Sequence, residues 1–534
     1  MIETLTKIGT AFVCAVFFSL TTVKTLGAMQ QSGYKNKTFL RWLRRGDNLF
    51  FNRLFVLAIT LSVFCATTSL AFSFLGKTWA LAISAIPFVL FLVVFILVDC
   101  KYALKLPYKA TGRFVRLFVV YTLVVFGVNF GVISLLWYLS TLNGSTIYAL
   151  VAFAPFSLLT AILPFLLCFA NLLCCPFENA RNKKYVQRAQ KILSENQVIR
   201  VGIVGSFGKT SVKNILKEIL AVKYKVLETP ASYNTPMGIA RTVTKEDFPK
   251  QEVFIAEMGA RKTGDIAELC TLVRPDYAIF TGVCEQHIST FKSLENVFAE
   301  KSEILASGAV TVCGEGLKER IIEKFEGEPS NAIFADSSVI SDLEMTATYT
   351  KFLLTLDGEK IPVQTTLLGR AAVENILLAA TLAKRMGLTG EEIARGIANV
   401  GQIPHRLQLL ENNGIYILDD GYNCNPRGAV EALAALCRFS GEKCIVTPGI
   451  VECGVLEEKI NAELGERIAA CRLDCVILVG ETLVGAVKKG YLEKGGDETK
   501  LFVVKSLEEA KTRLSAWVKA GDAVLFLNDL PDVY

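Results

Sequence analysis

The sequence has little of several features that define common protein classes. Its 534 residues include only two histidines, and its 15 cysteines form no CxxC pair and no metal-ligand spacing. This argues against a cysteine-based zinc site and favours a reducing compartment over a disulfide framework. The sequence has no internal repeat and no low-complexity linker. The net charge of +6 is small for so long a chain and does not indicate nucleic-acid binding.

Apolar residues, in contrast, are in excess at one end of the chain. Hydrophobic residues make up 52% of the sequence and the mean hydropathy is +0.41, which is too high for a purely soluble protein. Five runs in the first ~180 residues are each long enough to cross a hydrocarbon core of ~30 Å as a helix, at 8–29, 54–75, 79–99, 117–140 and 146–175. The first run is interrupted by Lys24 but lacks a convincing signal-peptide cleavage pattern. We therefore predict an all-α membrane domain of about five transmembrane helices over residues 1–185, with the lipid bilayer as a partner.

The charges between the apolar runs predict the orientation of this domain. Lysines and arginines gather between the first and second runs, between the third and fourth, and after the fifth, whereas 76–78 and 141–145 hold only Lys77. By the positive-inside rule the N-terminus lies outside and everything after Ala180 lies in the cytoplasm. We expect a multi-pass protein of the cell membrane with cytoplasmic catalytic domains.

The remainder of the chain alternates short apolar runs with helical patterns, as in α/β domains with parallel sheets. The first group of predicted strands is 201–204, 253–256, 277–281 and 309–313. A Thr-rich antiparallel insert at 345–368 and a helix at 371–386 follow. A second α/β unit begins near Gly414, with strands at 415–418, 443–447, 475–479, 501–504 and 523–527.

The most informative segment is 198–211, VIRVGIVGSFGKTS. An apolar strand, a glycine turn, a Lys-Thr pair and the start of a helix form a phosphate cradle, because the glycines let backbone N–H groups face the anion. Lys209 adds a positive charge and Thr210 is suited to hold Mg²⁺. The strict Walker spacing would require a glycine at Ile203, so this is a shorter G-x-x-G-K-T form.

Several further motifs accompany this cradle along the chain. They are SYNTPMG at 232–238, EMGARKTGDI at 257–266, RPDYAIFTGVCEQHI at 274–288, SLENVFAEKSEIL at 293–305, NILLAATLA at 375–383, PHRLQ at 404–408 and DDGYNCNP at 419–426. With GSFGKTS they resemble, in the same order, the Mur ligase family of ATP-dependent amino-acid-adding enzymes of peptidoglycan precursor synthesis. The resemblance is closest to the D-alanyl-D-alanine-adding branch.

The resemblance implies a domain plan and a reaction. Residues 186–402 correspond to the central ATP-binding domain with a P-loop, and residues 403–534 correspond to the Rossmann-like C-terminal domain. The implied reaction activates a carboxylate of a cell-wall peptide precursor as an acyl phosphate, with ATP and Mg²⁺, for attack by an amino acid or dipeptide. The resemblance does not cover the first ~190 residues, where the family normally has a soluble UDP-sugar-binding domain.

The resemblance also assigns roles to individual residues. The nucleotide would contact Gly205, Ser206, Gly208, Lys209, Thr210, Ser211, Asn375, Arg406 and Asp420. The metal ligands would be Thr210, Glu257, His287 and Lys301, with Lys301 converted to a carbamate. The catalytic residues would be Lys209, His287, Lys301 and Arg406. The substrate residues would be Asn234, Thr235, Tyr422 and Asn423, of which the first two lie in the loop that resembles the family's acyl-substrate contact region. Since Asp419 and Asp420 alternate sides along a strand, either could face the site.

The sequence departs from the family pattern at a few of these positions. Glu374 stands where the family has a histidine, and Gly421 and Cys424 replace a usual serine and alanine. Residues from both α/β domains contribute to the predicted site, which implies that the domains close around the substrates and exclude water.

Alternative functions remain open at this stage. The acyl substrate is either UDP-linked or lipid-linked. An amidating ligase that uses ammonia from a glutaminase partner is a second reading, although the four-cysteine zinc ribbon of that branch is not found. An ATP-driven membrane transporter or sensor is a third, but there is no LSGGQ-like signature, and the apolar runs hold few ionisable residues that could form a polar pathway. The sequence identifies neither a protein partner nor an oligomeric state.

Overall fold

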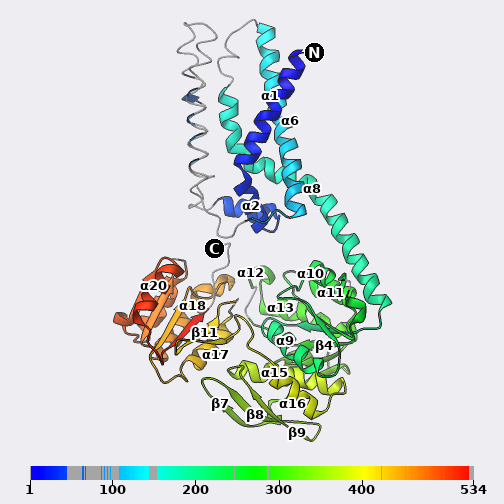
Figure 1. Ribbon diagram of the computed structural model, residues 1–534, viewed down its shortest axis with the longest axis vertical. Coiled ribbons are helices and arrows are strands. Elements are labelled where there is room, and N and C mark those ends of the chain that lie inside the picture. The colour runs from blue at the N-terminus through cyan, green and yellow to red at the C-terminus, as the bar shows by residue number, and fades with distance from the viewer. Residues whose placement is uncertain are drawn as a thin grey trace. The chain divides into compact units, whose positions relative to one another are not determined.

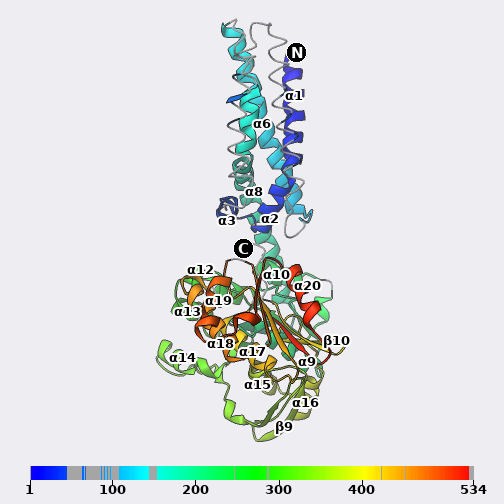
Figure 2. The ribbon, with the colours of Figure 1, turned by 90° about the vertical axis from the view of Figure 1, so that its left-hand side faces the viewer.

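The computed structural model describes residues 2–44, 108–143, 153–245, 247–284, 288–422, 424–451, 453–480 and 482–527, with single positions between 60 and 97. The chain divides into two compact units, a helical unit up to Asn182 and an α/β unit from Lys183. Figure 1 and Figure 2 show both units, which are described separately below.

The helical unit combines long apolar helices with two short ones. Its described elements are α1 (Ile2–Thr21), α2 (Val23–Gln31), α3 (Asn36–Leu43), α6 (Gly112–Asn143) and α8 (Phe153–Glu195), the last of which continues into the α/β unit. Segments Gly112–Leu139 and Ile162–Glu195 are long and apolar enough to cross a membrane, and α1 with α2, bent by 51°, is a third candidate. The predicted spans at 54–75 and 79–99 lie almost entirely outside the described residues.

Polar contacts join the ends of these helices around a core of apolar side chains. Asn171 on α8 donates to the Tyr34 carbonyl at 2.9 Å and to Asn36 Oδ1 at 2.8 Å. Arg116 Nε on α6 donates to Glu178 Oε1 on α8 at 2.6 Å, and the Glu178 side chain is only 5% exposed. The connection between α2 and α3 is thereby fixed against α8, and the buried carboxylate is paired as burial requires.

The α/β unit begins with a parallel six-stranded sheet, the first sheet, in the order β2-β3-β1-β4-β5-β6. Alternate residues point to opposite faces: Val253 and Ile255 of β3 pack with α9, α15 and α16, whereas Phe254 and Ala256 belong to the core with α10 and α11. Its strands are Ile199–Val204, Val226–Glu228, Val253–Glu257, Tyr277–Phe280, Val310–Cys313 and Ala332–Phe334, numbered β1 to β6.

Helices cover both faces of the first sheet (Figure 1). They are α9 (Lys209–Ala221), α10 (Pro236–Val243), α11 (Asp265–Val273), α12 (Ile288–Phe291), α13 (Leu294–Lys301), α14 (Lys318–Lys324), α15 (Arg370–Arg385) and α16 (Gly390–Ala398). The expected antiparallel insert is present as β7 (Ile340–Met345), β8 (Thr350–Leu356) and β9 (Glu359–Thr365), and it begins five residues before its predicted start. The predicted helix at 371–386 is α15.

The C-terminal part of the unit forms a second six-stranded sheet, in the order β10-β11-β15-β12-β13-β14. All its pairings are parallel except that of the edge strand β10 with β11. The strands are Gln408–Asn412, Ile415–Asp420, Lys443–Thr447, Cys475–Val479, Leu501–Val504 and Ala523–Leu527, numbered β10 to β15, and the helices are α17 (Pro426–Leu436), α18 (Glu457–Ala470), α19 (Val484–Glu493) and α20 (Leu507–Trp517), visible in Figure 2.

Candidate functional site

The turn between β1 and α9 is shaped so that only glycines fit. Gly208 precedes α9 with φ +73°, and a Cβ there would lie 2.6 Å from Asn375 Oδ1. A Cβ on Gly205 would lie 1.9 Å from Thr281 Oγ1. The Ser206 hydroxyl, next to Gly205, is buried and has no hydrogen-bond partner in the described part of the chain. A close turn at a helix N-terminus, with an unpartnered hydroxyl, is suited to hold phosphate oxygens.

Two lysines meet at this turn. Lys209 Nζ donates to the Gly205 carbonyl at 2.7 Å, and Lys301 Nζ, from the end of α13, donates to the same oxygen at 3.0 Å. Burial, and secondarily the Lys209 charge, lower the pKa of Lys301 from 10.5 to about 7. Burial also lowers the pKa of Lys209. Two cations that share one carbonyl form a place where added negative charge would be stabilised.

A buried carboxylate lies beside the cradle at the end of β3. Glu257 is 2% exposed, and its Oε2 accepts a hydrogen bond of 3.0 Å from Thr210 Oγ1. Its Oε1 accepts one of 3.3 Å from Asn234 Nδ2, and Lys213 Nζ lies 3.4 Å from Oε2. The structure thus brings together Thr210, Glu257 and Asn234, which the sequence placed in the metal and acyl-substrate sets.

Thr235 has a different contact from its neighbour Asn234. Its hydroxyl caps α10 by accepting from Gly238 N at 3.3 Å, and Pro236 follows at the first helical position. This cap fixes the loop that precedes α10 and so supports the position of Asn234. A role for Thr235 in substrate contact remains a prediction.

The junction between the two sheets contributes a second group of residues. Arg406 Nη1 donates to the Tyr422 carbonyl at 2.8 Å, and its guanidinium lies 5.0 Å from the Tyr422 ring centre. The Tyr422 hydroxyl lies 3.0 Å from Ser232 Oγ in the loop before Asn234. His405 and Leu407, on either side of Arg406, have positive φ values of 58° and 47°. Tyr422 therefore links the C-terminal sheet to the predicted acyl-substrate loop.

The neighbouring aspartates differ in their surroundings. Asp420 lines a pocket and accepts from Leu407 N at 3.0 Å, whereas Asp419 Oδ2 lies 2.8 Å from His405 Nδ1. Burial raises the pKa of Asp420 to about 6, and the Arg406 charge opposes this rise. The sequence alone allowed either Asp419 or Asp420 to face the site, and the structure places Asp420 at the pocket.

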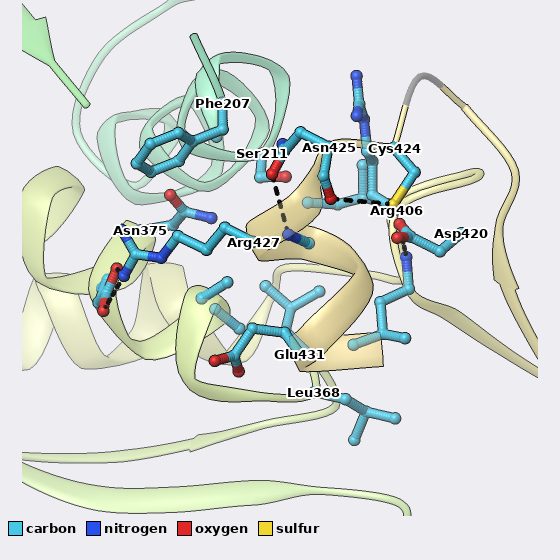
Figure 3. Close-up of a pocket in the computed structure, with 18 of the residues that line it drawn as sticks. Phe207, Ser211, Leu368, Asn375, Arg406, Asp420, Cys424, Asn425, Arg427 and Glu431 are labelled. Atoms are coloured by element: carbon cyan, nitrogen blue, oxygen red, sulfur yellow. Dashed lines mark hydrogen bonds and ion pairs between the residues drawn. The ribbon is translucent and has the colours of Figure 1, made fainter. Parts of the chain in front are cut away.

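That pocket lies between the two sheets and is shown in Figure 3. It is lined by Gly208 and Ser211 from the cradle, Asn375 from α15, and Arg406, Asp420 and Arg427 from the C-terminal side. Asn375 and Arg427 lie near Phe207 on the left of Figure 3, and Arg406, Cys424 and Asp420 lie on the right. The predicted nucleotide residues thus surround one cavity, next to the turn that would hold phosphates.

An ion pair that the motifs did not indicate lines this pocket. Arg427 Nη2 donates to both carboxylate oxygens of Glu374 at 2.6 Å, and its guanidinium lies 5.0 Å from the Phe207 ring centre. Glu374 is the position where the sequence departs from the family's histidine. The departure was visible in the sequence, but its partner was not, because Arg427 lies 53 residues away.

The remaining predicted residues are placed only in part. His287 and Asn423 lie outside the described residues, so their metal and substrate roles remain predictions. Lys213 and Phe207 were missed by the motif analysis. The one available signal for Lys213 was its spacing of four residues from Lys209, which puts both lysines on one face of a helix.

The donors present fit a magnesium nucleotide. The hydroxyl of Thr210 and the carboxylate of Glu257 are oxygen ligands that lie 3.0 Å apart beside the cradle. No cluster of three or more His, Cys, Asp or Glu side chains suited to a metal occurs among the residues that the structure describes. Mg²⁺ is commonly held by one or two protein oxygens together with water and substrate phosphates, and Thr210 and Glu257 supply two such oxygens.

Family models match the whole of this site. A model of the Mur ligase middle domain matches residues 203–383, and one of the Mur ligase glutamate ligase domain matches residues 405–528. Together they cover more than half of the chain.

Curated relatives are similar over the same region. UDP-N-acetylmuramoyl-tripeptide--D-alanyl-D-alanine ligase of Escherichia coli is 29% identical over 319 residues, which cover 57% of this chain and 69% of that protein. The enzyme of that name from Bacillus subtilis is 28% identical over 313 residues, which cover 55% of this chain and 65% of that protein. The similarity thus spans about two thirds of these relatives' length.

Solved structures share the fold. MurF from Acinetobacter baumannii superposes with a TM-score of 0.60 at 21% identity, covering 66% of this chain and 78% of that one. MurF ligase from Thermotoga maritima in complex with ADP superposes with a TM-score of 0.59 at 26% identity, covering 66% and 81%. The two α/β domains expected from the sequence are therefore those of a MurF-like fold.

Proposed function

The chain belongs to the Mur ligase family of ATP-dependent amide ligases, and from that premise we propose that it adds D-alanyl-D-alanine to a cell-wall peptide precursor. The relatives that support the dipeptide assignment carry that activity in their names. The proposed domains are a membrane domain at 1–185, the ATP-binding domain at 186–402 and the C-terminal domain at 403–534.

One observation supports this function most directly. The side chain of Glu257 lies within hydrogen-bond reach of both Thr210 on the phosphate cradle and Asn234 on the predicted acyl-substrate loop. A phosphoryl donor at the cradle and a carboxylate at this loop would therefore lie next to each other. This is the geometry that transfer of a phosphoryl group to a carboxylate requires.

The proposed reaction has two steps. In the first, a carboxylate oxygen of the precursor attacks the γ-phosphorus of ATP, which forms an acyl phosphate and releases ADP. In the second, the dipeptide amine attacks the acyl carbon, which forms the amide and expels inorganic phosphate. Lys209 would neutralise charge on the transferred phosphoryl group, and Arg406 would approach the phosphates from the domain junction. The loop with Asn234 would orient the carboxylate, and Tyr422 would hold that loop closed.

Magnesium would be held by Thr210, Glu257 and His287, where it supplies positive charge to the phosphate oxygens. We propose that Lys301 becomes a carbamate, which changes a cation into an anionic oxygen ligand. Its pKa of about 7 supports this because carbamoylation requires the neutral amine. Asn375 and Asp420 would contact the base and ribose in the pocket, and Asn423 would contact the acyl substrate.

The helical unit suggests where in the cell the enzyme acts. We propose that it anchors the enzyme in the cell membrane with the catalytic domains in the cytoplasm, as its apolar helices and basic loops favour. A cysteine introduced at Asn143 should then react with an impermeant thiol reagent in intact cells once native cysteines are controlled, whereas one at Arg44 should not. Labelling at Arg44 alone would reverse the proposed orientation.

A reconstitution experiment tests the proposed activity. The full chain in lipid nanodiscs is incubated with ATP, Mg²⁺, D-alanyl-D-alanine and either a UDP-linked or a polyprenyl-linked precursor. We expect ADP release that requires both carboxylate and amine, and an amide product identified by mass spectrometry; the productive precursor identifies the carrier. An amide product formed with ammonia in place of the dipeptide would indicate an amidating enzyme. In a parallel assay with the chain in sealed vesicles, ADP release that needs neither substrate but accompanies transport of a solute across the membrane would contradict a ligase and indicate a transporter.

A further inference from the structure

The proposed reaction gives no role to Lys213, one of the most completely buried cations in the described part of the chain. It lies on α9 one turn after Lys209 and is 1% exposed. Its ammonium donates to the Thr229 carbonyl at 2.7 Å and to the Ala231 carbonyl at 2.5 Å. Its third neighbour is Glu257 Oε2 at 3.4 Å. A lysine is seldom buried this fully, so its three contacts need an explanation.

These contacts match the bonding capacity of the ammonium group. A lysine has three N–H donors, and Lys213 has three oxygen neighbours, one of them charged. A buried ion pair is tolerated when its remaining donors are satisfied, and removing one partner leaves an uncompensated charge. Both side chains of the pair are 2% exposed, so solvent cannot take the place of either partner.

The two carbonyls belong to the segment that leads into the predicted acyl-substrate loop. Thr229 also binds the Glu257 backbone, since its hydroxyl accepts from Glu257 N at 3.0 Å. Ala231 has φ +48°, a left-handed conformation that a residue with a Cβ adopts at a cost in energy. Since the Lys213 ammonium binds the Ala231 carbonyl, it helps to hold this unfavourable conformation.

Lys213 therefore connects the two substrates' binding elements. On one side it holds the segment 229–231, which leads to Asn234. On the other it holds the Glu257 carboxylate, which faces Thr210 at the cradle. A shift of this ammonium would move the acyl-substrate loop relative to the metal-binding carboxylate, and misplacement by about 1 Å is enough to lower rates strongly.

We propose that Lys213 is a positioning residue, which aligns the acyl-substrate loop with the metal-binding carboxylate Glu257 by binding both. The proposal rests on the proposed function, because that function names the loop as the site of the acyl carboxylate. The neighbours of the Lys213 ammonium described above are all protein oxygens, so we assign it a positioning role and not a catalytic one. Its influence should therefore appear in the binding of the acyl substrate and in the charge balance at Glu257.

The test uses Lys213→Met in the full chain, which keeps the length of the side chain but removes its charge and donors. We expect the KM for the acyl substrate to rise by about 10-fold or more and kcat to fall by about 10–100-fold, whereas the KM for ATP changes by less than about 3-fold. The matched control is Lys217→Met, one turn further along α9, where the lysine is 37% exposed. It should leave all three constants unchanged.

Two measurements that do not depend on turnover separate positioning from simple loss of stability. Hydrogen exchange of the amides at 229–235 should be faster in Lys213→Met than in the wild type. The rise in melting temperature on adding Mg²⁺ with ADP should be larger in the variant, because Glu257 then lacks its lysine and the metal supplies the missing positive charge. A purely structural lysine would lower the melting temperature equally with and without the metal nucleotide.

A second variant covers the case in which Lys213→Met does not fold. Ala231→Val leaves the buried charge in place but makes the left-handed conformation of residue 231 more costly, and it should raise the acyl-substrate KM by about 2–5-fold without changing that for ATP. Unchanged acyl-substrate KM values and unchanged loop exchange in the folded variants would overturn the proposal. If the wild type itself forms no amide, the proposed function fails, while the loop exchange and the thermal shifts still report on Lys213.

Discussion

The two ends of the candidate site differ in how their charges are held. At the phosphate end, formed by the cradle with Glu257, Lys213 and Lys301, both members of the Lys213–Glu257 pair are 2% exposed. At the junction end, formed by Arg406, Asp420, Tyr422 and the Arg427–Glu374 pair, the two members of that pair are 48% and 37% exposed. The buried pair at the phosphate end is held by the protein alone, whereas the Arg427–Glu374 pair at the junction end is accessible to water and can separate.

This difference predicts which end of the site acts on the chemical step and which acts on nucleotide binding. Fixed, buried charges stabilise charge that develops during reaction without reorganising, so they act mainly on the chemical step. Exposed pairs contribute about 0–1 kcal/mol and are suited to contacts that form and break as domains close. Substitutions at the phosphate end should therefore lower kcat strongly, and those in the partly exposed Arg427–Glu374 pair should act weakly and mainly on nucleotide binding.

The largest effect is expected at Lys209. Lys209→Ala should lower amide formation on the order of 1,000-fold or more and leave the fold intact, because the charge is needed when phosphate is bound. Steady-state kinetics and circular dichroism measure both expectations, with Lys217→Ala as the control on the same helix. Activity within a few-fold of the wild type would contradict the assignment of the cradle.

The second effect concerns the modification of Lys301. Lys301→Ala should lose most activity, and short carboxylic acids should partly restore it by occupying the position of the carbamate. Lys301→Arg should not be rescued, since the guanidinium fills that space and keeps the wrong charge. Turnover at different acetate concentrations measures the rescue. A fully active Lys301→Ala enzyme in bicarbonate-free buffer would show that this lysine is not a metal ligand.

The third effect is a dependence of stability on pH at the junction end. Burial raises the pKa of Asp420 from 3.8 to about 6, so between these values the folded protein binds more protons than the unfolded chain. The stability that Asp420 contributes therefore falls as pH rises through this window and stays low above it. Asparagine carries no charge, so Asp420→Asn removes the cost of burying an ionised carboxylate at pH 7.5. The increase in the free energy of unfolding that it causes should be about 1–2 kcal/mol larger at pH 7.5 than at pH 4. The same substitution should weaken ATP binding.

Denaturant titrations of Asp420→Asn and the wild type at the two pH values check this expectation. Asp419→Asn is the matched control, because Asp419 pairs with His405 outside the pocket. If the free energies of unfolding of Asp420→Asn and the wild type differ by the same amount at both pH values, Asp420 is not a buried ionised carboxylate.

The smallest effect is expected for the exposed pair across the pocket. Glu374→Gln should raise the KM for ATP by about 2–5-fold and leave kcat nearly unchanged, because a pair this exposed is weak. Raising the salt concentration should give the wild type part of the same increase. A loss of kcat comparable to that of Lys209→Ala would show that the junction end is as fixed as the phosphate end.

The sequence predicted the strands of the α/β unit well where apolar runs are bounded by turns. The predicted ends of β12, β13, β14 and β15 agree with the structure residue for residue. The edge strands β2 and β6 were missed because each has three half-buried residues, which is too few to show a period. The edge strand β10 was missed because its residues are mostly exposed and polar.

The sequence predicted the site residues that belong to recognisable motifs. It did not predict the residues whose role depends on contacts between distant parts of the chain. GSFGKTS and Glu257 indicated the phosphate end through their residue types. Lys213 was missed despite its spacing of four residues from Lys209, because a lysine on a helix is usually solvated and only the packing of β3 and the loop at 229–231 buries it. Arg427 was missed for a similar reason, since its partner Glu374 belongs to another domain. His287 and Asn423 stay predictions.

The central claim is that the buried phosphate end activates a carboxylate as an acyl phosphate. The most direct test follows an oxygen atom, using precursor whose terminal carboxylate carries ¹⁸O at both oxygens. Because that oxygen attacks phosphorus and leaves with it, we predict one ¹⁸O atom in each inorganic phosphate released with the amide. Phosphate that carries no ¹⁸O while the amide accumulates would contradict the account.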